Sequence, residues 1–279
     1  MSNNQNQMDP YLISTAVRAA MCAGSEILDV YCEESIDVEY KSDKSPLTKA
    51  DIRANTVITA VLRETELPIL SEEGVHLPFE ERQQWKLFWL IDPLDGTNEF
   101  VARLGDFCVN IALIDKTEPV MGVIYSPVKD TVWFGAIGYG AYKIEEATKV
   151  IDDFSYETLV RAAIKLPYRN TGDEFVFVAS RSNLNAPTKQ FIDAVSKGYS
   201  KTRIAHIGSA LKFTVLAEGL ADLYPRFATT SEWDTGAGHA ILRSIGGDIF
   251  QEETNIPLVY NKANLDNPGF VAFLKNSKE

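Results

Sequence analysis

The sequence has little of what builds disulfide-rich proteins or zinc sites. Its 279 residues include three cysteines and three histidines. Cys22, Cys32 and Cys108 are odd in number and show no C-x-x-C spacing, so the sequence predicts neither a disulfide framework nor a zinc ribbon. Unpaired cysteines fit a reducing compartment, and we therefore expect a cytoplasmic protein.

Positive charge and long apolar segments are also scarce. Lysine and arginine number 27 against 39 aspartates and glutamates, which gives a formal net charge of -12. This excess argues against nucleic acid and against an anionic membrane surface as partners. No apolar run approaches the ~20 residues that span a bilayer, and the N-terminal MSNNQNQMDPYL lacks the basic and apolar regions of a signal peptide. We expect no integral membrane span, and a phosphorylated substrate would need cations to be bound.

The composition nonetheless allows a large core. Hydrophobic residues make up 45% of the chain and charged residues 24%, which predicts one large or two moderate globular domains. Helical spacing of apolar residues predicts helices at 9–31 and 48–64. Short apolar segments separated by turns predict strands at 68–71, 87–91, 107–115, 120–125 and 131–136. Because the links are short, we expect an antiparallel meander backed by the two helices.

The second half of the chain alternates between the two element types. Strands are predicted at 175–179, 203–206 and 221–224, and helices at 187–196, 209–218 and 233–245. Alternation of this kind is typical of a layered α/β unit. The polar stretch at 145–158 is the best candidate for a junction. We therefore divide the chain into an N-terminal α+β subdomain, residues 1–155, and a C-terminal α/β subdomain, residues 156–279.

Acidic residues recur where predicted strands end. The stretch WLIDPLDGTNEF at 89–100 places Asp92 and Asp95 around a proline, and SEEG at 71–74 places Glu72 after another strand. Solvated turn charges would explain each pair in isolation. The alternative is a metal-binding corner, in which the proline helps to aim the Leu94 carbonyl and a helix starting at Thr97 offers amides to a phosphate oxygen.

Two further acids stand where helices begin. Asp51 forms a T-x-x-D pattern with Thr48, and Asp234 opens the helix of EWDTGAGHAILRSIGG. Each alone is typical of a helix cap. The small residues 236–238 of that second helix would let another backbone or a ligand approach closely.

Convergence of these acids would require cations. Four carboxylates brought together without them would repel one another and lose solvation. Ligands that are all oxygen favour Mg²⁺, with Mn²⁺ as the alternative ion, and argue against zinc.

The motifs together resemble the inositol monophosphatase superfamily of Mg²⁺-dependent, lithium-sensitive phosphatases. Its patterns D-P-x-D-G-T, a preceding E-E, and W-D-x-x-A-G-x-x-I followed by G-G occur here as DPLDGT, SEEG and WDTGAGHAILRSIGG. The resemblance spans nearly the whole chain. It implies a layered αβαβα sandwich in which an N-terminal α+β unit and a C-terminal α/β unit meet at the active site.

Within the superfamily the chain is most similar to the bacterial 3′(2′),5′-bisphosphate nucleotidases. GSALKFTVLAEGLADLYPRF resembles their G-S-S-L-K-F and A-D-x-Y-P-R, and SRSN resembles their S-R-S-H. Asn183 replaces the usual histidine of the last motif, which leaves a nucleotide contact there open. Arg226 stands where inositol monophosphatases commonly have an acid, and an arginine suits a second phosphate. An inositol or sugar phosphatase and a non-catalytic metal-binding or nucleotide-binding protein remain alternatives.

The resemblance assigns roles to individual residues. It implies two or three Mg²⁺ ions held by Glu72, Asp92, the Leu94 carbonyl, Asp95 and Asp234. It implies a catalytic group that orients and deprotonates the attacking water, made of Asp51, Thr97 and Glu72. For the substrate it points to Gly96, Thr97, Gly208, Ser209, Lys212, Arg226 and Asp234.

The implied reaction converts adenosine 3′,5′-bisphosphate to AMP and phosphate, with its sulfated relative as a further candidate. A small phosphorylated nucleotide is thus the expected ligand. For Ser209, Lys212 and Arg226, a helix cap and two surface cations are the structural alternative. The sequence leaves open the preference between 2′- and 3′-phosphates, the strength of lithium inhibition, and whether the chain is a monomer or a homodimer.

Overall fold

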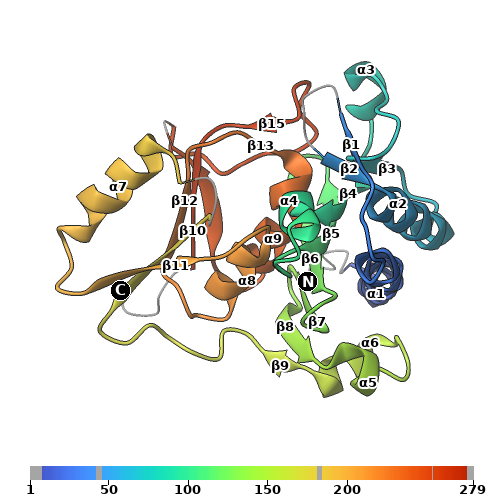
Figure 1. The fold of residues 1–279 in the computed structure, drawn as a ribbon, viewed down its shortest axis with the longest axis horizontal. Helices are drawn as coiled ribbons and strands as arrows, with labels where there is room; N and C mark the ends of the chain where they lie inside the picture. Colours follow the sequence, from blue (N-terminus) through green and yellow to red (C-terminus); the bar gives the residue numbers. More distant parts are fainter. Residues whose placement is uncertain (1–7, 42–45, 181–183, 253, 275–279) are drawn as a thin grey trace, which may run out of the picture.

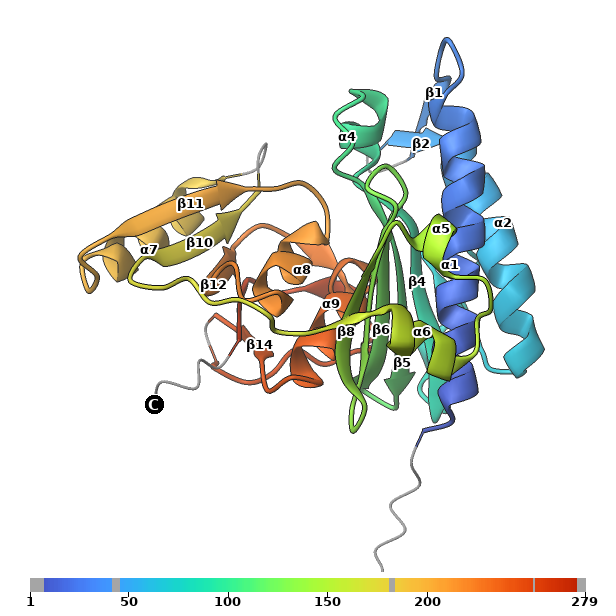
Figure 2. The ribbon, with the colours of Figure 1, turned by 90° about the horizontal axis from the view of Figure 1, so that it is seen from below.

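The computed structural model describes residues 8–41, 46–180, 184–252 and 254–274, and Asn183 lies outside these ranges. Within them the elements stack as helices, sheet, helices, sheet and helix (Figures 1 and 2). The order is α1 and α2, a large sheet, α8 and α9, a smaller sheet, and α7. This is the αβαβα sandwich that the resemblance implies.

The outer helical layer agrees with the expected helices. α1 covers Pro10–Tyr31 and α2 covers Lys49–Leu62, followed by a 3-10 turn, η1, at Arg63–Thr65. Asp9 caps α1 by accepting a hydrogen bond from the Tyr11 amide at 2.9 Å, and Pro10 occupies the first turn. The buried face of α1 packs on the large sheet together with α2. None of the described helices is long and apolar enough to cross a membrane.

The large sheet is mostly the expected meander. Among the described residues its strands run in the order β3 (Ile69–Ser71), β4 (Leu87–Asp95), β5 (Cys108–Asp115), β6 (Glu118–Ser126), β7 (Thr131–Ala136), β8 (Gly140–Glu145) and β9 (Ile164–Lys165). From β4 to β9 each neighbouring pair is antiparallel. β3 instead pairs parallel with β4, because the crossover through α3 (Phe79–Arg82) returns the chain to the end of the sheet at which β3 begins. Parallel pairing puts the ends of both strands, and so the acids that follow them, at one edge.

Shorter elements complete the N-terminal half. A hairpin of β1 (Val38–Tyr40) and β2 (Pro46–Thr48) precedes α2, and α4 (Thr97–Val101) follows β4. α5 (Ala147–Val150) and α6 (Tyr156–Ala162) occupy the predicted junction. Because β9 pairs with β8, the large sheet ends at Lys165. The division of the chain after residue 155 stays a prediction.

The second half has the alternating elements that the sequence predicts and some that it does not. In the described region they are β10 (Phe175–Ala179), α7 (Ala186–Ser196), β11 (Thr202–His206), α8 (Leu211–Ala217), β12 (Leu223–Arg226), β13 (Thr230–Ser231), α9 (Glu232–Arg243), β14 (Asp248–Gln251), β15 (Asp266–Asn267) and β16 (Phe270–Phe273). The smaller sheet has the order β11-β10-β12-β16-β14. Its parallel strands β10, β11 and β12 were expected, whereas its antiparallel edge of β16 and β14 was not.

Glycines fix α9 between the two sheets. A Cβ on Gly122 of β6 would lie 2.1 Å from the Ala237 carbonyl oxygen, and one on Gly238 would lie 2.3 Å from the ring of Phe213 in α8. The close approach expected at residues 236–238 is therefore made by protein groups. This packing directs the start of α9 toward the end of β4 (Figure 1).

Candidate active site

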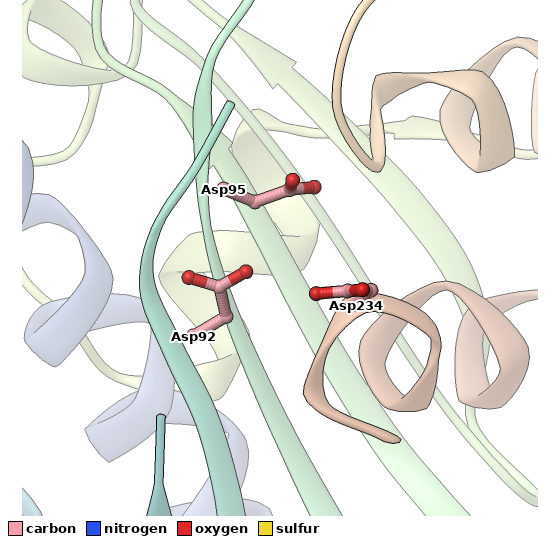
Figure 3. Close-up of side chains that lie close together, drawn as sticks. All are labelled: Asp92, Asp95 and Asp234. Carbon is pink, nitrogen blue, oxygen red and sulfur yellow. The ribbon is translucent and has the colours of Figure 1, made fainter. Parts of the chain in front are cut away.

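Three carboxylates converge between the end of β4 and the start of α9. One oxygen from each of Asp92, Asp95 and Asp234 lies within 4.8 Å of the other two. Figure 3 shows the side chain of Asp234 extending from α9 toward the two aspartates of β4. Asp92 is buried and the other two are partly buried. The structure thus brings together three of the predicted metal ligands from distant parts of the sequence.

A backbone amide orients each of these carboxylates. The Leu94 amide donates to Asp92 Oδ1 at 3.1 Å, within the irregular register that surrounds Pro93. The Ala210 amide donates to Asp95 Oδ2. The Ser231 amide donates to Asp234 Oδ2 at 2.8 Å, in a capping box that opens α9. Asp234 therefore occupies position N3 of a capping box whose N-cap is Ser231. Its carboxylate can stabilise the start of the helix and also belong to the site.

Two residues of β5 support Asp95 from behind. Asn110 Nδ2 donates to Asp95 Oδ2 at 3.3 Å, and Cys108 Sγ lies 3.9 Å from the same oxygen. Both are buried, and in the β4–β5 ladder Asn110 stands opposite Asp92 and Cys108 opposite Asp95. Neither was predicted from the sequence as a residue of the site. The available signal was the antiparallel pairing of the strands predicted at 87–91 and 107–115, which continues past residue 91 in the structure.

Proximity and burial disturb the titration of the cluster. Burial raises the pKa of Asp234 to about 8, and the Asp95 charge acts in the same direction. Burial also raises the pKa of Asp92 well above its usual range, helped by the charges of Glu72, Asp95 and Asp234. The pKa of Asp95 is raised by burial although the Lys212 charge opposes it. The ionised forms of these three aspartates are therefore disfavoured unless a positive charge lies beside them.

Glu72 lies beside this cluster with a cation of its own. It lines the same cavity as the three aspartates and follows β3, so the parallel β3–β4 pairing brings it there. Lys41 Nζ donates to Glu72 Oε1 at 2.7 Å and to Glu73 Oε1 at 2.5 Å. Burial alone would lower the pKa of Lys41, but these two carboxylates outweigh it and raise that pKa. The sequence analysis did not single out Lys41.

Asp51 and Thr97 lie next to each other, as the resemblance implies. Thr97 Oγ1 is 3.3 Å from Asp51 Oδ1 and 3.2 Å from the Leu94 carbonyl oxygen. Asp51 Oδ2 accepts from the amide and the hydroxyl of Thr48, at 2.7 Å each. Burial raises the pKa of Asp51, whereas these bonds from Thr48 oppose the rise. Asp51 is therefore both the N3 residue of the capping box that starts α2 and a hydrogen-bond acceptor for Thr97.

A cavity of about 470 Å³ is lined both by the acids and by two cations, Lys212 and Arg226, and we refer to these two groups of residues as its acidic end and its cationic end. Of the predicted residues it is lined by Glu72, Asp92, Leu94, Asp95, Gly96, Thr97, Ser209, Lys212, Arg226 and Asp234.

Lys212 and Arg226 form the cationic end. Burial lowers the pKa of Lys212 to about 8 in spite of the Asp95 charge, and Arg226 acts in the same direction as burial. Lys212 Nζ donates to the carbonyls of Ile207 and Ser209. Within the described part of the chain, Nε of Arg226 is buried and has no hydrogen-bond partner. An anion is the ligand to which this N–H group would donate a hydrogen bond.

Gly96 and Gly208 both pack against the segment before β5. Gly96 has a φ of 94°, and a Cβ there would lie 3.0 Å from the Asp106 carbonyl oxygen. A Cβ on Gly208 would lie 2.8 Å from the same oxygen. Gly96 lines the cavity, whereas Gly208 is not among the described residues that line it. A substrate contact at Gly208 therefore stays a prediction from the sequence.

The donor set fits hard divalent cations. The converging groups are the carboxylates of Asp92, Asp95 and Asp234, all with raised pKa values, and Leu94 lines the same cavity. A divalent cation would offset both the loss of solvation and the mutual repulsion that raise these pKa values. Oxygen donors of this kind suit Mg²⁺ and Mn²⁺.

Comparisons with known proteins agree with this geometry. The profile of the inositol monophosphatase family matches residues 9–270. The 3′(2′),5′-bisphosphate nucleotidase CysQ of Escherichia coli K12 is 39% identical over 263 residues, which are 93% of this chain and 98% of that protein. The corresponding protein of Aggregatibacter actinomycetemcomitans is 35% identical over 94% of this chain and 92% of its own length.

Solved structures give the same result for the fold. The crystal structure of CysQ from Bacteroides thetaiotaomicron superposes with a TM-score of 0.87 at 43% identity, covering 94% of this chain and 97% of that one. The suppressor protein suhB of Bartonella henselae superposes with a TM-score of 0.71 at 23% identity, covering 95% and 94%. At that lower identity the likeness concerns the fold alone.

Proposed function

Because this chain belongs to the inositol monophosphatase family, we propose that it is a phosphoric monoester hydrolase that removes the 3′-phosphate of adenosine 3′,5′-bisphosphate. The products are AMP and inorganic phosphate. Relatives named as 3′(2′),5′-bisphosphate nucleotidases support the substrate class. The observation that carries the proposal is one cavity lined by a carboxylate cluster and by Arg226, whose buried Nε has no hydrogen-bond partner among the described residues.

At the acidic end, the chain would hold two or three Mg²⁺ ions, with Mn²⁺ as the alternative. The ligands proposed are Glu72, Asp92, the Leu94 carbonyl, Asp95 and Asp234. When bound, the metal neutralises phosphate charge and lowers the pKa of the attacking water. The protein contributes carboxylates that backbone amides already hold in place, so little reorganisation is needed when the substrate arrives.

Asp51 and Thr97 form the proposed water-positioning pair. Thr97 can accept a hydrogen bond from water while its own hydroxyl hydrogen is directed to Asp51. Asp51 is held by Thr48 and cannot turn away without breaking the cap of α2. This arrangement orients a water and offers an acceptor for its proton, which is the role of a general base. Glu72 completes the proposed catalytic group.

At the cationic end, Arg226 and Lys212 are the proposed partners of the second phosphate. A guanidinium can bind two phosphate oxygens at once, and both cations line the cavity that the carboxylates line. Because Lys212 already donates to two carbonyls, we assign the larger share of phosphate binding to Arg226. An acid at position 226 would instead suit a polyol, and this is what separates the proposal from an inositol or sugar phosphatase.

A set of three substrates tests the proposal. Purified protein with Mg²⁺ is given adenosine 3′,5′-bisphosphate, 3′-AMP or inositol 1-phosphate, and phosphate release is measured. We expect kcat/KM to be highest for the bisphosphate, by on the order of tenfold to a hundredfold over 3′-AMP, because a charge-assisted hydrogen bond contributes about 1.5–3 kcal/mol. A faster reaction with inositol 1-phosphate would reverse the assignment. Turnover of the sulfated relative, the oligomeric state and the cytoplasmic location stay predictions.

A further inference from the structure

Two segments outside the large sheet must be held in place for the acids to converge. Asp92 and Asp95 belong to β4, which is paired on both sides. Glu72 lies at the start of the segment between β3 and β4, and Asp234 lies in the first turn of α9. Cation binding therefore depends on how this segment is held against the start of α9.

The start of α9 is anchored through Glu232, whose side chain is completely buried. Its Oε2 accepts from the Asn261 amide at 2.6 Å. Its Oε1 accepts from the Lys262 amide at 2.9 Å and from Lys262 Nζ at 2.6 Å. Both oxygens are thus used, and they tie the residue two positions before Asp234 to residues 261 and 262.

Arg82 of α3 binds the other side of the same two residues. Its Nη1 donates to Asn261 Oδ1 at 2.7 Å, and Asn261 Nδ2 donates back to the Arg82 carbonyl at 2.8 Å. Its Nη2 donates to the Lys262 carbonyl at 3.1 Å and its Nε to the Leu77 carbonyl at 3.0 Å. Arg82 is 3% exposed although it makes no ion pair with a carboxylate among the described residues. A buried guanidinium satisfied by neutral acceptors is unusual enough to call for a reason.

We infer that Arg82 is a positioning residue of the metal centre, acting through Asn261, Lys262 and Glu232, a set that we call the Arg82 latch. The latch joins the segment that begins at Glu72 to the first turn of α9. Packing of the His76 ring against the Trp233 ring, with centroids 5.4 Å apart, adds a second contact between the same two segments. The inference rests on the proposed function, because it assumes that the acids bind a divalent cation.

The physical reason is the repulsion within the metal-free site. One oxygen from each of Asp92, Asp95 and Asp234 lies within 4.8 Å of the other two, so that the ionised carboxylates, without a cation, would repel one another and favour separation of α9 from β4. The latch opposes that separation before any metal arrives, so that binding does not have to include the cost of closing the site. Loss of the latch should therefore raise the Mg²⁺ concentration needed, and it should leave the chemical step at saturating Mg²⁺ nearly unchanged.

The test compares Arg82→Gln with Arg243→Gln as a matched control. Arg243 is also an arginine that connects α9 to the N-terminal half, but at the far end of the helix. Its Nη2 donates to Glu118 Oε2 at 2.9 Å and its Nη1 to the Pro119 carbonyl at 3.2 Å. Glutamine at position 82 leaves no buried charge behind, since the acceptors lost are neutral. Both variants should lower the melting temperature, and only one of them touches the latch.

Two readouts are measured for each variant, namely Mg²⁺ binding by calorimetry without substrate and the Mg²⁺ dependence of phosphate release. For Arg82→Gln we expect half-saturation by Mg²⁺ to rise on the order of tenfold in both, with kcat at saturating Mg²⁺ within about twofold of the parent. Arg243→Gln should keep the parent's Mg²⁺ dependence. Equal Mg²⁺ dependence of the two variants would overturn the inference and leave Arg82 a merely structural residue.

Two other variants keep the test decisive if Arg82→Gln does not fold. Lys262→Met keeps the amide hydrogen bonds to Glu232 but removes the cation that pairs with this buried carboxylate, and we expect the Mg²⁺ requirement to rise in the same direction. Arg82→Lys retains one donor and should lie between Arg82→Gln and the parent. An unchanged Mg²⁺ requirement in both would contradict the inference. Parent protein that binds Mg²⁺ without releasing phosphate would refute the proposed function alone, because the calorimetric comparison would still decide on Arg82.

Discussion

Asp234→Asn should stabilise the metal-free protein and abolish its response to Mg²⁺. Burial, with the Asp95 charge, raises the pKa of Asp234 from 3.8 to about 8. An acid whose folded-state pKa is raised contributes stability that is fully present below the unfolded pKa and is lost as pH rises through the folded pKa. At pH 7 most of that stability has been lost. The metal-free protein therefore bears an electrostatic cost that the substitution removes.

The size of the effect follows from the interval between 3.8 and 7. At about 1.4 kcal/mol per pKa unit the cost is on the order of 4 kcal/mol. We expect relief of about 2 kcal/mol, because the asparagine amide must itself be desolvated. For a chain of this length this corresponds to a rise in melting temperature of about 4 °C. The capping of α9 should survive, since the amide oxygen can accept from the Ser231 amide as the carboxylate does.

Thermal unfolding at pH 7 with EDTA and with saturating Mg²⁺ measures both halves of this prediction. The parent should gain stability on Mg²⁺ binding, about 2.7 kcal/mol when Mg²⁺ is at a hundred times its dissociation constant. Asp234→Asn should gain little or nothing. Asp9→Asn, the same substitution at the exposed cap of α1, is the matched control and should respond to Mg²⁺ as the parent does. A lower melting temperature of Asp234→Asn in EDTA, or an unimpaired Mg²⁺ response, would refute the reasoning.

Three further predictions concern the catalytic pair, the second phosphate and pH. Thr97→Val should lower kcat by about a hundredfold to a thousandfold with little change in KM, because it removes the hydroxyl that bonds Asp51; steady-state kinetics that showed only a raised KM would contradict this. Arg226→Glu should reduce kcat/KM for adenosine 3′,5′-bisphosphate by more than about a hundredfold and spare 3′-AMP, whereas equal losses would place Arg226 outside phosphate recognition. In EDTA, the melting temperature should fall as pH rises from about 4 to about 8, since the raised pKa values of Asp92 and Asp234 make the folded state bind more protons than the unfolded chain; a melting temperature that rises over this interval would oppose the electrostatic account.

The residues of the site that lie on one local stretch could be predicted well from the sequence. Asp92, Leu94, Asp95 and Thr97 follow one another through the end of β4 and into α4, so a single motif contains their geometry. The capping pattern of Asp51 is equally local, and the structure retains it as a capping box. Local hydrogen bonding decides both arrangements, which is why the motif alone was informative.

Contacts between segments that are distant in the sequence could not be predicted from local sequence patterns. The parallel pairing of β3 with β4 is made by a crossover, and the sequence predicted only a meander, although that pairing is what brings Glu72 to the cluster. The Ala210 amide that orients Asp95 comes from another layer of the sandwich. Arg82 carries no periodic signal, because its role depends on meeting Asn261 in the folded chain.

Three short strands were not predicted from the sequence, for a related reason. β14, β15 and β16 have four, two and four residues, too few for alternation of apolar and polar side chains to stand out. β14 and β16 pair with each other, and β16 also pairs with β12, at one edge of the smaller sheet, whereas β15 pairs with β13 in a separate two-stranded sheet. Tertiary context, rather than intrinsic propensity, therefore fixed this edge.

The nucleotide product shows which of the two phosphates the protein removes. Purified protein is incubated with adenosine 3′,5′-bisphosphate and Mg²⁺, and the products are assigned by phosphorus NMR. We predict 5′-AMP and inorganic phosphate, formed only while Mg²⁺ is free to bind, because the carboxylate cluster takes the 3′-phosphate and Arg226 holds the 5′-phosphate. Formation of 3′-AMP, or no reaction by protein that hydrolyses inositol 1-phosphate, would contradict it.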